Sequence, residues 1–112
     1  MLKENRQAKR NIRPLNINYC LSADSPPQWM SSIIGDISSG GVKFMAPRDL
    51  KDKMLNLEIK SPRLAPRTLK LEAIVLDSNP SKLSSFFDTR AKFLNLSQEN
   101  IKDLSVLENK QR

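Results

Sequence analysis

The sequence has no histidine and only one cysteine, Cys20, among its 112 residues. Without imidazole or a second thiol, most metal sites and most imidazole-based acid–base catalysis are excluded. The Asp and Glu residues show no pairing typical of a catalytic centre. A single cysteine also excludes an internal disulfide and fits a reducing compartment. The composition therefore favours a binding protein over an enzyme, with no metal and no cofactor.

The sequence also lacks a long apolar segment. No run approaches the roughly 18 apolar residues of a membrane-spanning helix, and the opening MLKENRQAKR is charged where an export signal is apolar. With 38% hydrophobic and 28% charged residues, the chain has the composition of one globular domain. We therefore expect a single cytoplasmic domain without a membrane span.

Positive charge is abundant, and it is concentrated near the N terminus. The formal net charge is +7, and residues 1–13 hold five basic residues against one acidic residue. The basic ones are Lys3, Arg6, Lys9, Arg10 and Arg13. Such a segment is either a solvated tail or an arm that binds phosphate, and charge alone leaves both interpretations open.

Beyond residue 13, apolar and polar residues alternate with the period of two that is typical of strands. This pattern predicts strands at 12–22, 29–38, 41–46, 54–60, 68–77 and 86–96. Connections rich in Pro and Ser separate them, and prolines do not fit central strands. Short strands at regular spacing favour an antiparallel barrel or sandwich.

The last part of the chain has helical spacing instead. Ser97 is suited to cap a helix over 97–109, and Ile101, Leu104 and Leu107 recur on one face of it. That apolar stripe needs a partner, so we expect the helix to pack against the barrel.

All three glycines of the chain fall in one segment, IIGDISSGGVKF at 33–44. Gly40 and Gly41 permit positive φ and close backbone approach, so the strand must bend or end beside them. Asp36 and Ser38 are two residues apart and therefore point to the same face of an extended strand. The segment is either a hairpin turn, with Asp and Ser bonding local backbone, or a ligand site that offers a carboxylate and a hydroxyl.

Two motifs in this chain resemble those of the PilZ domain family. Residues 36–41 read D-x-S-x-x-G, and RQAKR at 6–10 reads R-x-x-x-R. The second motif is weak by itself, and RLAPR at 63–67 is a second copy that we interpret as coincidental. The resemblance covers roughly residues 5–108. It implies a six-stranded antiparallel β-barrel with a C-terminal helix that binds the bacterial second messenger cyclic di-GMP.

The resemblance also implies an organisation and a site. Residues 1–11 would be a flexible basic arm, 12–96 the barrel and 97–109 the closing helix. The implied ligand residues are Arg6, Arg10, Asp36, Ser38 and Gly41, with Lys9, Arg13 and Gly40 as secondary candidates. Arginine pairs bidentately with phosphate or with guanine O6 and N7, and a carboxylate accepts from guanine N–H groups.

The stretch KENRQAKRN at 3–11 is polar apart from one alanine and cannot bury apolar area, so without ligand we expect the arm to be mobile. Ligand held by both the arm and the barrel would order the arm and change the surface offered to a protein partner. Some family members stack a large side chain on guanine from a late strand, where this chain has Leu76. Trp29 is interpreted as barrel packing.

Two other functions remain open at this point. One is a PilZ-type adaptor that binds proteins and no nucleotide. The other is a small basic barrel that binds nucleic acid, which the few aromatic residues disfavour because they look more like core than a stacking surface. No DNA or RNA partner is expected.

Overall fold

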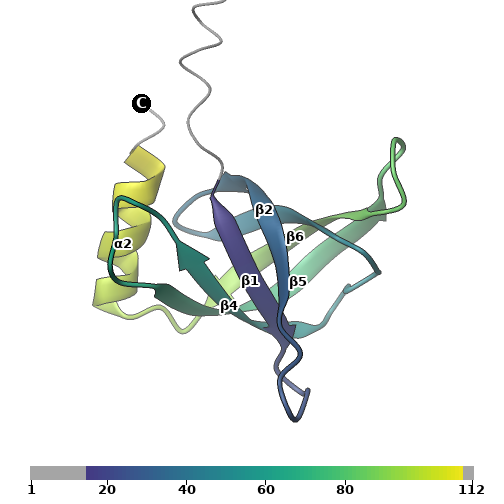
Figure 1. The fold of residues 1–112 in the computed structure, drawn as a ribbon, viewed down its shortest axis with the longest axis horizontal. Coiled ribbons are helices and arrows are strands. Elements are labelled where there is room, and N and C mark those ends of the chain that lie inside the picture. Colours follow the sequence, from purple (N-terminus) through teal and green to yellow (C-terminus); the bar gives the residue numbers. More distant parts are fainter. Residues whose placement is uncertain (1–14, 110–112) are drawn as a thin grey trace, which may run out of the picture.

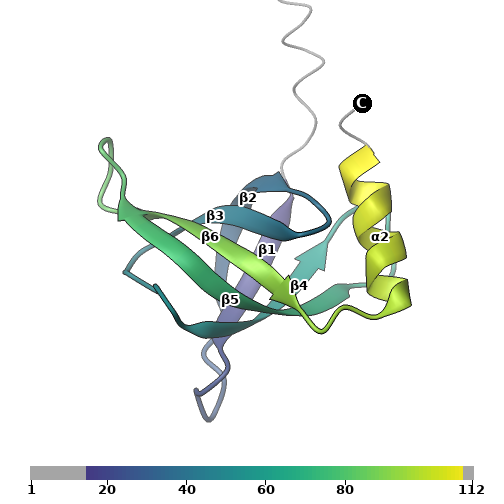
Figure 2. The same cartoon turned by 180° about the vertical axis from the view of Figure 1, so that it is seen from behind.

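Six strands form a closed antiparallel barrel, and one helix follows them (Figures 1 and 2). The computed structural model describes residues 15–109. Around the barrel the order is β1-β2-β3-β6-β5-β4, and β4 pairs with β1 to close it. The strands are β1 (Asn16–Leu21), β2 (Met30–Ile37), β3 (Gly41–Ala46), β4 (Met54–Lys60), β5 (Leu69–Pro80) and β6 (Phe87–Leu94). The expected fold class is confirmed.

The period-two alternation predicts the core correctly in the central strands. Leu55, Leu57 and Ile59 of β4 are at most 1% exposed, because every second side chain of a strand points into the barrel. The fifth strand differs from the prediction at its end, since β5 continues through Ser78-Asn79-Pro80 and Pro80 pairs with Phe87. Proline is tolerated there because the position lies at a strand end.

Two β-bulges change which residues face outward. The register shifts between Ile34 and Asp36 in β2, and between Val75 and Asp77 in β5. Each shift inserts one extra residue opposite the neighbouring strand. After the bulge in β5, Leu76 and Asp77 both lie outside the core, and Ser78 returns to it.

Helix α2 (Gln98–Asn109) begins at the predicted cap. The Asn100 amide donates to Ser97 Oγ at 3.0 Å, and the Ser97 amide donates to Asn100 Oδ1 at 3.1 Å. This reciprocal pair is a capping box with Asn in the third position. Leu104 and Leu107 are buried in the core, whereas Ile101 is 49% exposed. The predicted apolar stripe was therefore wrong at Ile101.

The helix lies beside the connection between β4 and β5, at one side of the barrel (Figures 1 and 2). Arg67 of that connection donates from Nη2 to Asp103 Oδ1 of α2 at 2.6 Å. Asp103 is buried, and Leu64 of the same connection is 2% exposed. The second R-x-x-x-R copy thus holds the helix through Arg67. Among the described residues, no helix is long and apolar enough to cross a membrane.

Trp29, interpreted as barrel packing, is not part of the core, because the residue is 45% exposed. Continuing the β1–β2 register by one residue sets Trp29 opposite Cys20, on the outer face. Cys20 faces the same side by alternation, yet it is only 3% exposed. Burial raises the pKa of the Cys20 thiol, and a hydrogen bond with Asn56 opposes this effect.

Candidate functional site

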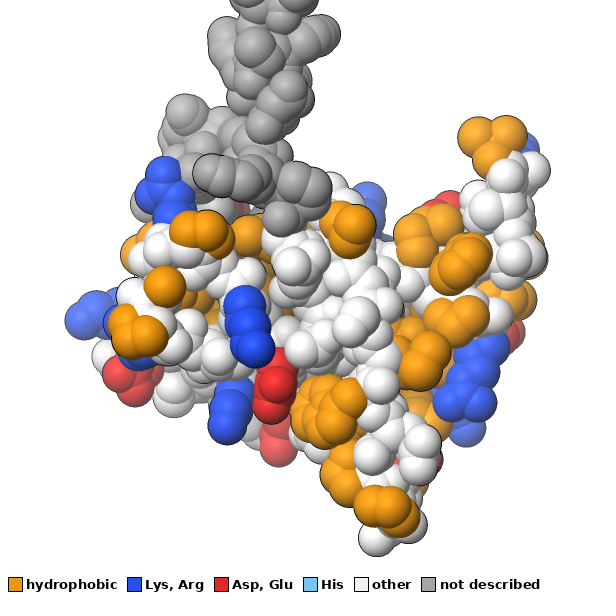
Figure 3. Space-filling model, in the orientation of Figure 1, with side chains coloured by type: hydrophobic (Ala, Val, Ile, Leu, Met, Phe, Trp, Pro, Cys, Tyr) orange, Lys and Arg blue, Asp and Glu red, His pale blue; other side chains and the backbone are white. Residues whose placement is uncertain are grey.

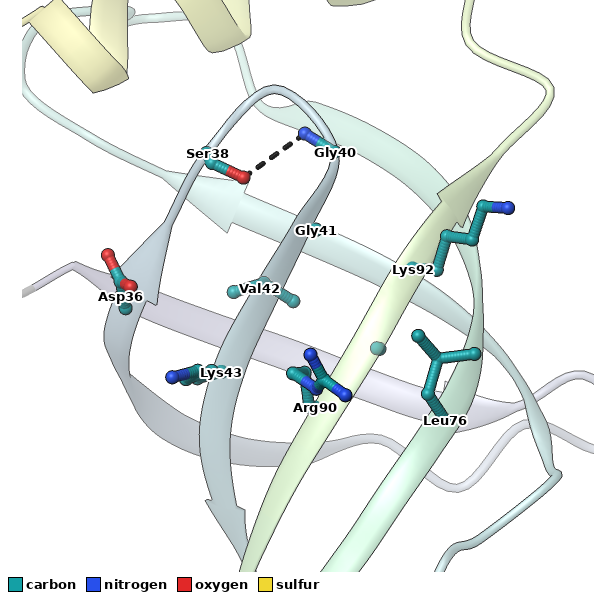
Figure 4. A pocket seen from close by; sticks show the side chains of 10 residues that line it. Asp36, Ser38, Gly40, Gly41, Val42, Lys43, Leu76, Arg90 and Lys92 are labelled. Atoms are coloured by element: carbon teal, nitrogen blue, oxygen red, sulfur yellow. Dashed lines mark hydrogen bonds between the residues drawn. The ribbon is translucent and has the colours of Figure 1, made fainter.

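Four charged residues form one row across the outer face of the barrel. Asp36 of β2 pairs with Lys43 of β3, Lys43 pairs with Arg90 of β6, and Arg90 pairs with Asp77 of β5. The two bulges bring this row into register, because each shifts the alternation of its strand by one residue. Residues far apart in sequence thus meet on one surface (Figure 4).

A cavity of about 300 Å³ opens beside this row, at the end of the β2–β3 hairpin (Figure 4). Its lining includes the three D-x-S-x-x-G residues, one exposed leucine from β5 and three cations from β3 and β6. These residues are Asp36, Ser38, Gly41, Leu76, Lys43, Arg90 and Lys92, and Gly40 also contributes. Every barrel residue that the sequence predicted for the site therefore lines one pocket.

Ser38 takes part in the hairpin turn itself. The Ser38 amide donates to the Gly41 carbonyl at 3.0 Å, and the Gly40 amide donates to Ser38 Oγ at 3.2 Å. The hairpin-turn interpretation is therefore correct in one respect, because the Ser38 hydroxyl oxygen accepts a hydrogen bond from local backbone. Its own proton remains available to donate. The Asp36 carboxylate is exposed, and within residues 15–109 it makes no hydrogen bond or ion pair.

Gly41 is required by close packing between β3 and β6. A Cβ added at Gly41 would lie 2.3 Å from the Ala91 carbonyl oxygen, which is far inside van der Waals contact. At Gly40 the nearest atom is Ser38 Oγ at 4.0 Å, so that position is open. No described glycine has a positive φ. The expected use of positive φ is thus wrong here, and close backbone approach explains Gly41.

Leu76 is the extra residue of the β5 bulge, and its side chain is 41% exposed at the pocket. Strict alternation after inward-facing Val75 also turns Leu76 outward, but the bulge keeps Asp77 on the outer side as well. The late-strand position expected to meet the ligand therefore borders the same cavity as Asp36 (Figure 4). Leu76 offers an apolar surface there.

The three cations of the pocket were not among the site residues predicted from the sequence. Lys43, Arg90 and Lys92 alternate with buried residues, so their outward direction was readable from GVKF and TRAKF. Their proximity to Asp36 was not readable, because it depends on β3 pairing with β6 across the barrel. Arg90 donates from Nε and Nη2 to Asp77 Oδ2, at 3.1 and 2.5 Å.

The predicted arm residues Arg6, Lys9, Arg10 and Arg13 lie outside the described residues. Within residues 15–109, no group of three Cys, Asp or Glu side chains is arranged to hold a metal ion. On the face shown in Figure 3, Lys and Arg side chains are scattered singly among polar and apolar ones. That face therefore offers no continuous basic groove of the kind that follows a nucleic-acid backbone.

The closed six-stranded barrel, with a polar pocket at one hairpin, defines a small β-barrel domain with a candidate ligand pocket. The family model described as the PilZ domain matches residues 4–107, so the chain belongs to the PilZ domain family. The resemblance inferred from the two motifs is confirmed.

A solved structure supports the shared fold. The PilZ domain of YcgR from Escherichia coli, with c-di-GMP, matches with a TM-score of 0.56 over 90% of this chain and 91% of that chain. The two sequences are 12% identical, and the likeness shows a common architecture. No curated protein matches this sequence.

Proposed function

We propose that this protein is a cyclic di-GMP-binding module that signals through a protein partner and catalyses no reaction. The observation that carries the proposal is that Asp36, Ser38 and Gly41 line the same pocket as Leu76 and three cations. Membership of the PilZ family and the likeness to a PilZ domain solved with c-di-GMP support this choice of ligand.

The pocket chemistry suits guanine. The Asp36 carboxylate is an acceptor for the N1–H and N2–H donors of the base, and the Ser38 hydroxyl adds one donor. The exposed side chain of Leu76 gives the flat face of the base an apolar contact. A cavity of about 300 Å³ is at the small end of ligand sites, so it takes one base and leaves the rest of the dinucleotide outside.

The basic arm supplies the other side of the ligand site in this proposal. Arg6 and Arg10 bind phosphate and guanine from outside the barrel, because arginine pairs bidentately with both groups. Ligand bound by arm and barrel together fixes the arm near the β2–β3 hairpin. The surface around the pocket then changes, and a partner protein distinguishes the two states by that difference.

Calorimetric titration with cyclic di-GMP tests the binding. We expect micromolar or tighter affinity for the natural chain. Asp36→Ala should weaken it by about 10- to 100-fold, because a hydrogen bond to a charged group contributes roughly 1.5–3 kcal/mol. Arg10→Ala should also weaken it strongly. The matched control is Asp88→Ala, an exposed carboxylate on the outer face of β6 that does not line the pocket.

Absence of binding heat at high protein concentration would reject the proposal. Partner capture unaffected by the dinucleotide would then favour an adaptor that binds no nucleotide. The arm's part is tested separately by trypsin, which cleaves after Lys9 and Arg10. Cyclic di-GMP should slow that cleavage in the natural chain and not in Asp36→Ala. Equal cleavage rates with and without ligand would contradict ordering of the arm.

A further inference from the structure

Arg90 is held in one orientation at the edge of the pocket. Its Nε and Nη2 groups both donate to the same oxygen of Asp77, at 3.1 and 2.5 Å. The two side chains are 52% and 45% exposed. An ion pair this exposed contributes only about 0–1 kcal/mol to stability. Its consequence is geometric, because two bonds to one oxygen fix the guanidinium plane.

The orientation leaves part of the guanidinium free for a ligand. Arginine has five N–H donors in a planar fork, and Asp77 takes one from Nε and one from Nη2. The two Nη1 donors and the second Nη2 donor remain. One Nη1 donor and the second Nη2 donor are parallel at the end of the fork, which is an edge that binds phosphate oxygens in pairs.

Two lysines complete the group of cations around Arg90. Lys43 is the register partner of Arg90, and Lys92 follows two residues later on the same face of β6. Both line the pocket and both are exposed. The lining thus holds three cations and one carboxylate, Asp36, and even with Asp77, which pairs with Arg90 beside the pocket, three positive charges meet only two negative ones. A neutral base needs no such excess of positive charge, whereas a phosphodiester does.

We propose that Arg90, Lys43 and Lys92 form a phosphate subsite on the barrel itself, and that Asp77 is the positioning residue of Arg90. This inference rests on the proposed function, because the phosphate is taken to be one of the two in cyclic di-GMP. One phosphate is then bound by the folded barrel, and the arm serves the rest of the ligand. The D-x-S-x-x-G and R-x-x-x-R motifs contain none of these four residues.

Titrations of Arg90 variants test the subsite. Arg90→Gln should weaken cyclic di-GMP binding by about tenfold or more, because it removes a charge-assisted contact. Arg90→Lys should retain more affinity than Arg90→Gln, since a phosphate accepts from an ammonium group. The matched control is Arg63→Gln, an exposed arginine of the β4–β5 connection outside the pocket. It should bind like the natural chain.

Replacing Asp77 tests its role, because two explanations predict opposite changes in ligand affinity. If Asp77 acts only as a negative charge near the pocket, Asp77→Ala should tighten anion binding by about twofold or less. If it positions Arg90, the same variant should weaken binding severalfold, and Asp77→Asn should recover part of the loss because its amide oxygen still accepts. In an Arg90→Gln background, Asp77→Ala should cause no further weakening.

The outcomes separate this inference from the proposed function. Natural-chain binding that Asp36→Ala weakens and Arg90→Gln leaves unchanged would overturn the phosphate subsite alone. Tighter binding by Asp77→Ala would overturn the positioning role. Weakening by Arg90→Gln without weakening by Asp36→Ala would support the subsite and reject the guanine site. No binding by the natural chain would reject both.

Discussion

Replacing Gly41 by alanine tests the account of the D-x-S-x-x-G glycine as a packing requirement. The added Cβ would lie 2.3 Å from the Ala91 carbonyl oxygen, 3.4 Å from its carbon and 3.5 Å from Lys92 Cα. All three atoms belong to the backbone of β6, which is paired on both sides within a closed barrel. No flexible side chain can move aside, so β3 and β6 must separate locally.

The expected loss of stability follows from comparing alanine substitutions at two adjacent glycines, Gly41 and Gly40. Overpacking of this kind costs about 1–3 kcal/mol. Replacing glycine by alanine also restricts the unfolded chain, which stabilises by about 0.4–1 kcal/mol in either position. Gly40 meets only Ser38 Oγ at 4.0 Å and its φ is not positive. The unfolded-state gain cancels in the comparison, so Gly41→Ala should be about 1–3 kcal/mol less stable than Gly40→Ala.

Thermal and urea denaturation followed by far-ultraviolet circular dichroism measure this difference. For a domain of this size, 1–3 kcal/mol corresponds to a midpoint lower by roughly 4–12 °C. Gly40→Ala should melt at or slightly above the natural protein. Equal midpoints for the two variants would refute the packing argument. The natural protein and both variants should show the same spectrum at low temperature, which verifies that the barrel forms.

Three further perturbations test other parts of the structure. Arg67→Ala breaks the ion pair with the buried carboxylate of α2 and should lower the free energy of unfolding by about 1–3 kcal/mol. Arg63→Ala should leave the free energy of unfolding unchanged, and equal effects of the two variants would contradict a specific contact of Arg67. Leu104→Ala should lower the free energy of unfolding by about 2–5 kcal/mol, and Ile101→Ala should lower it by less than about 0.5 kcal/mol. A larger loss from Ile101→Ala than from Leu104→Ala would contradict the orientation of the helix. The raised pKa of Cys20 leaves little thiolate near neutral pH. Its alkylation by iodoacetamide should therefore be slow in the folded protein and fast in denaturant, and equal rates would contradict burial.

Local pattern predicts most of the barrel because each strand carries its own alternation. The inward set Leu55, Leu57 and Ile59 is readable from MLNLEIK and is buried as expected. The cap at Ser97 is readable for the same reason, since it depends on residues only three positions apart. Asp36 and Ser38 are likewise two residues apart, so their common outer face follows from the sequence.

The residues that were predicted wrongly or not predicted depend on contacts between different strands or between helix and barrel, which alternation within one strand does not specify. Ile101 has helical spacing with Leu104, yet it lies outside the contact with the barrel. Lys43 and Arg90 meet because β3 pairs with β6, and strand order around a barrel is not a local property. The bulge at Leu76 sets the register between Asp77 and Arg90, and no single strand encodes it. The cationic side of the pocket therefore emerges only from the structure.

Mapping of backbone amide shifts by NMR during titration with cyclic di-GMP tests the central claim most directly, because it reports where the ligand binds. The largest shifts should occur at residues that line the pocket, namely Ser38, Gly40, Gly41 and Lys92. The amides of α2, none of whose residues lines the pocket, should keep their positions. Shifts centred on α2 or on β1 and β4, or no shifts at saturating ligand, would contradict the assignment of this pocket.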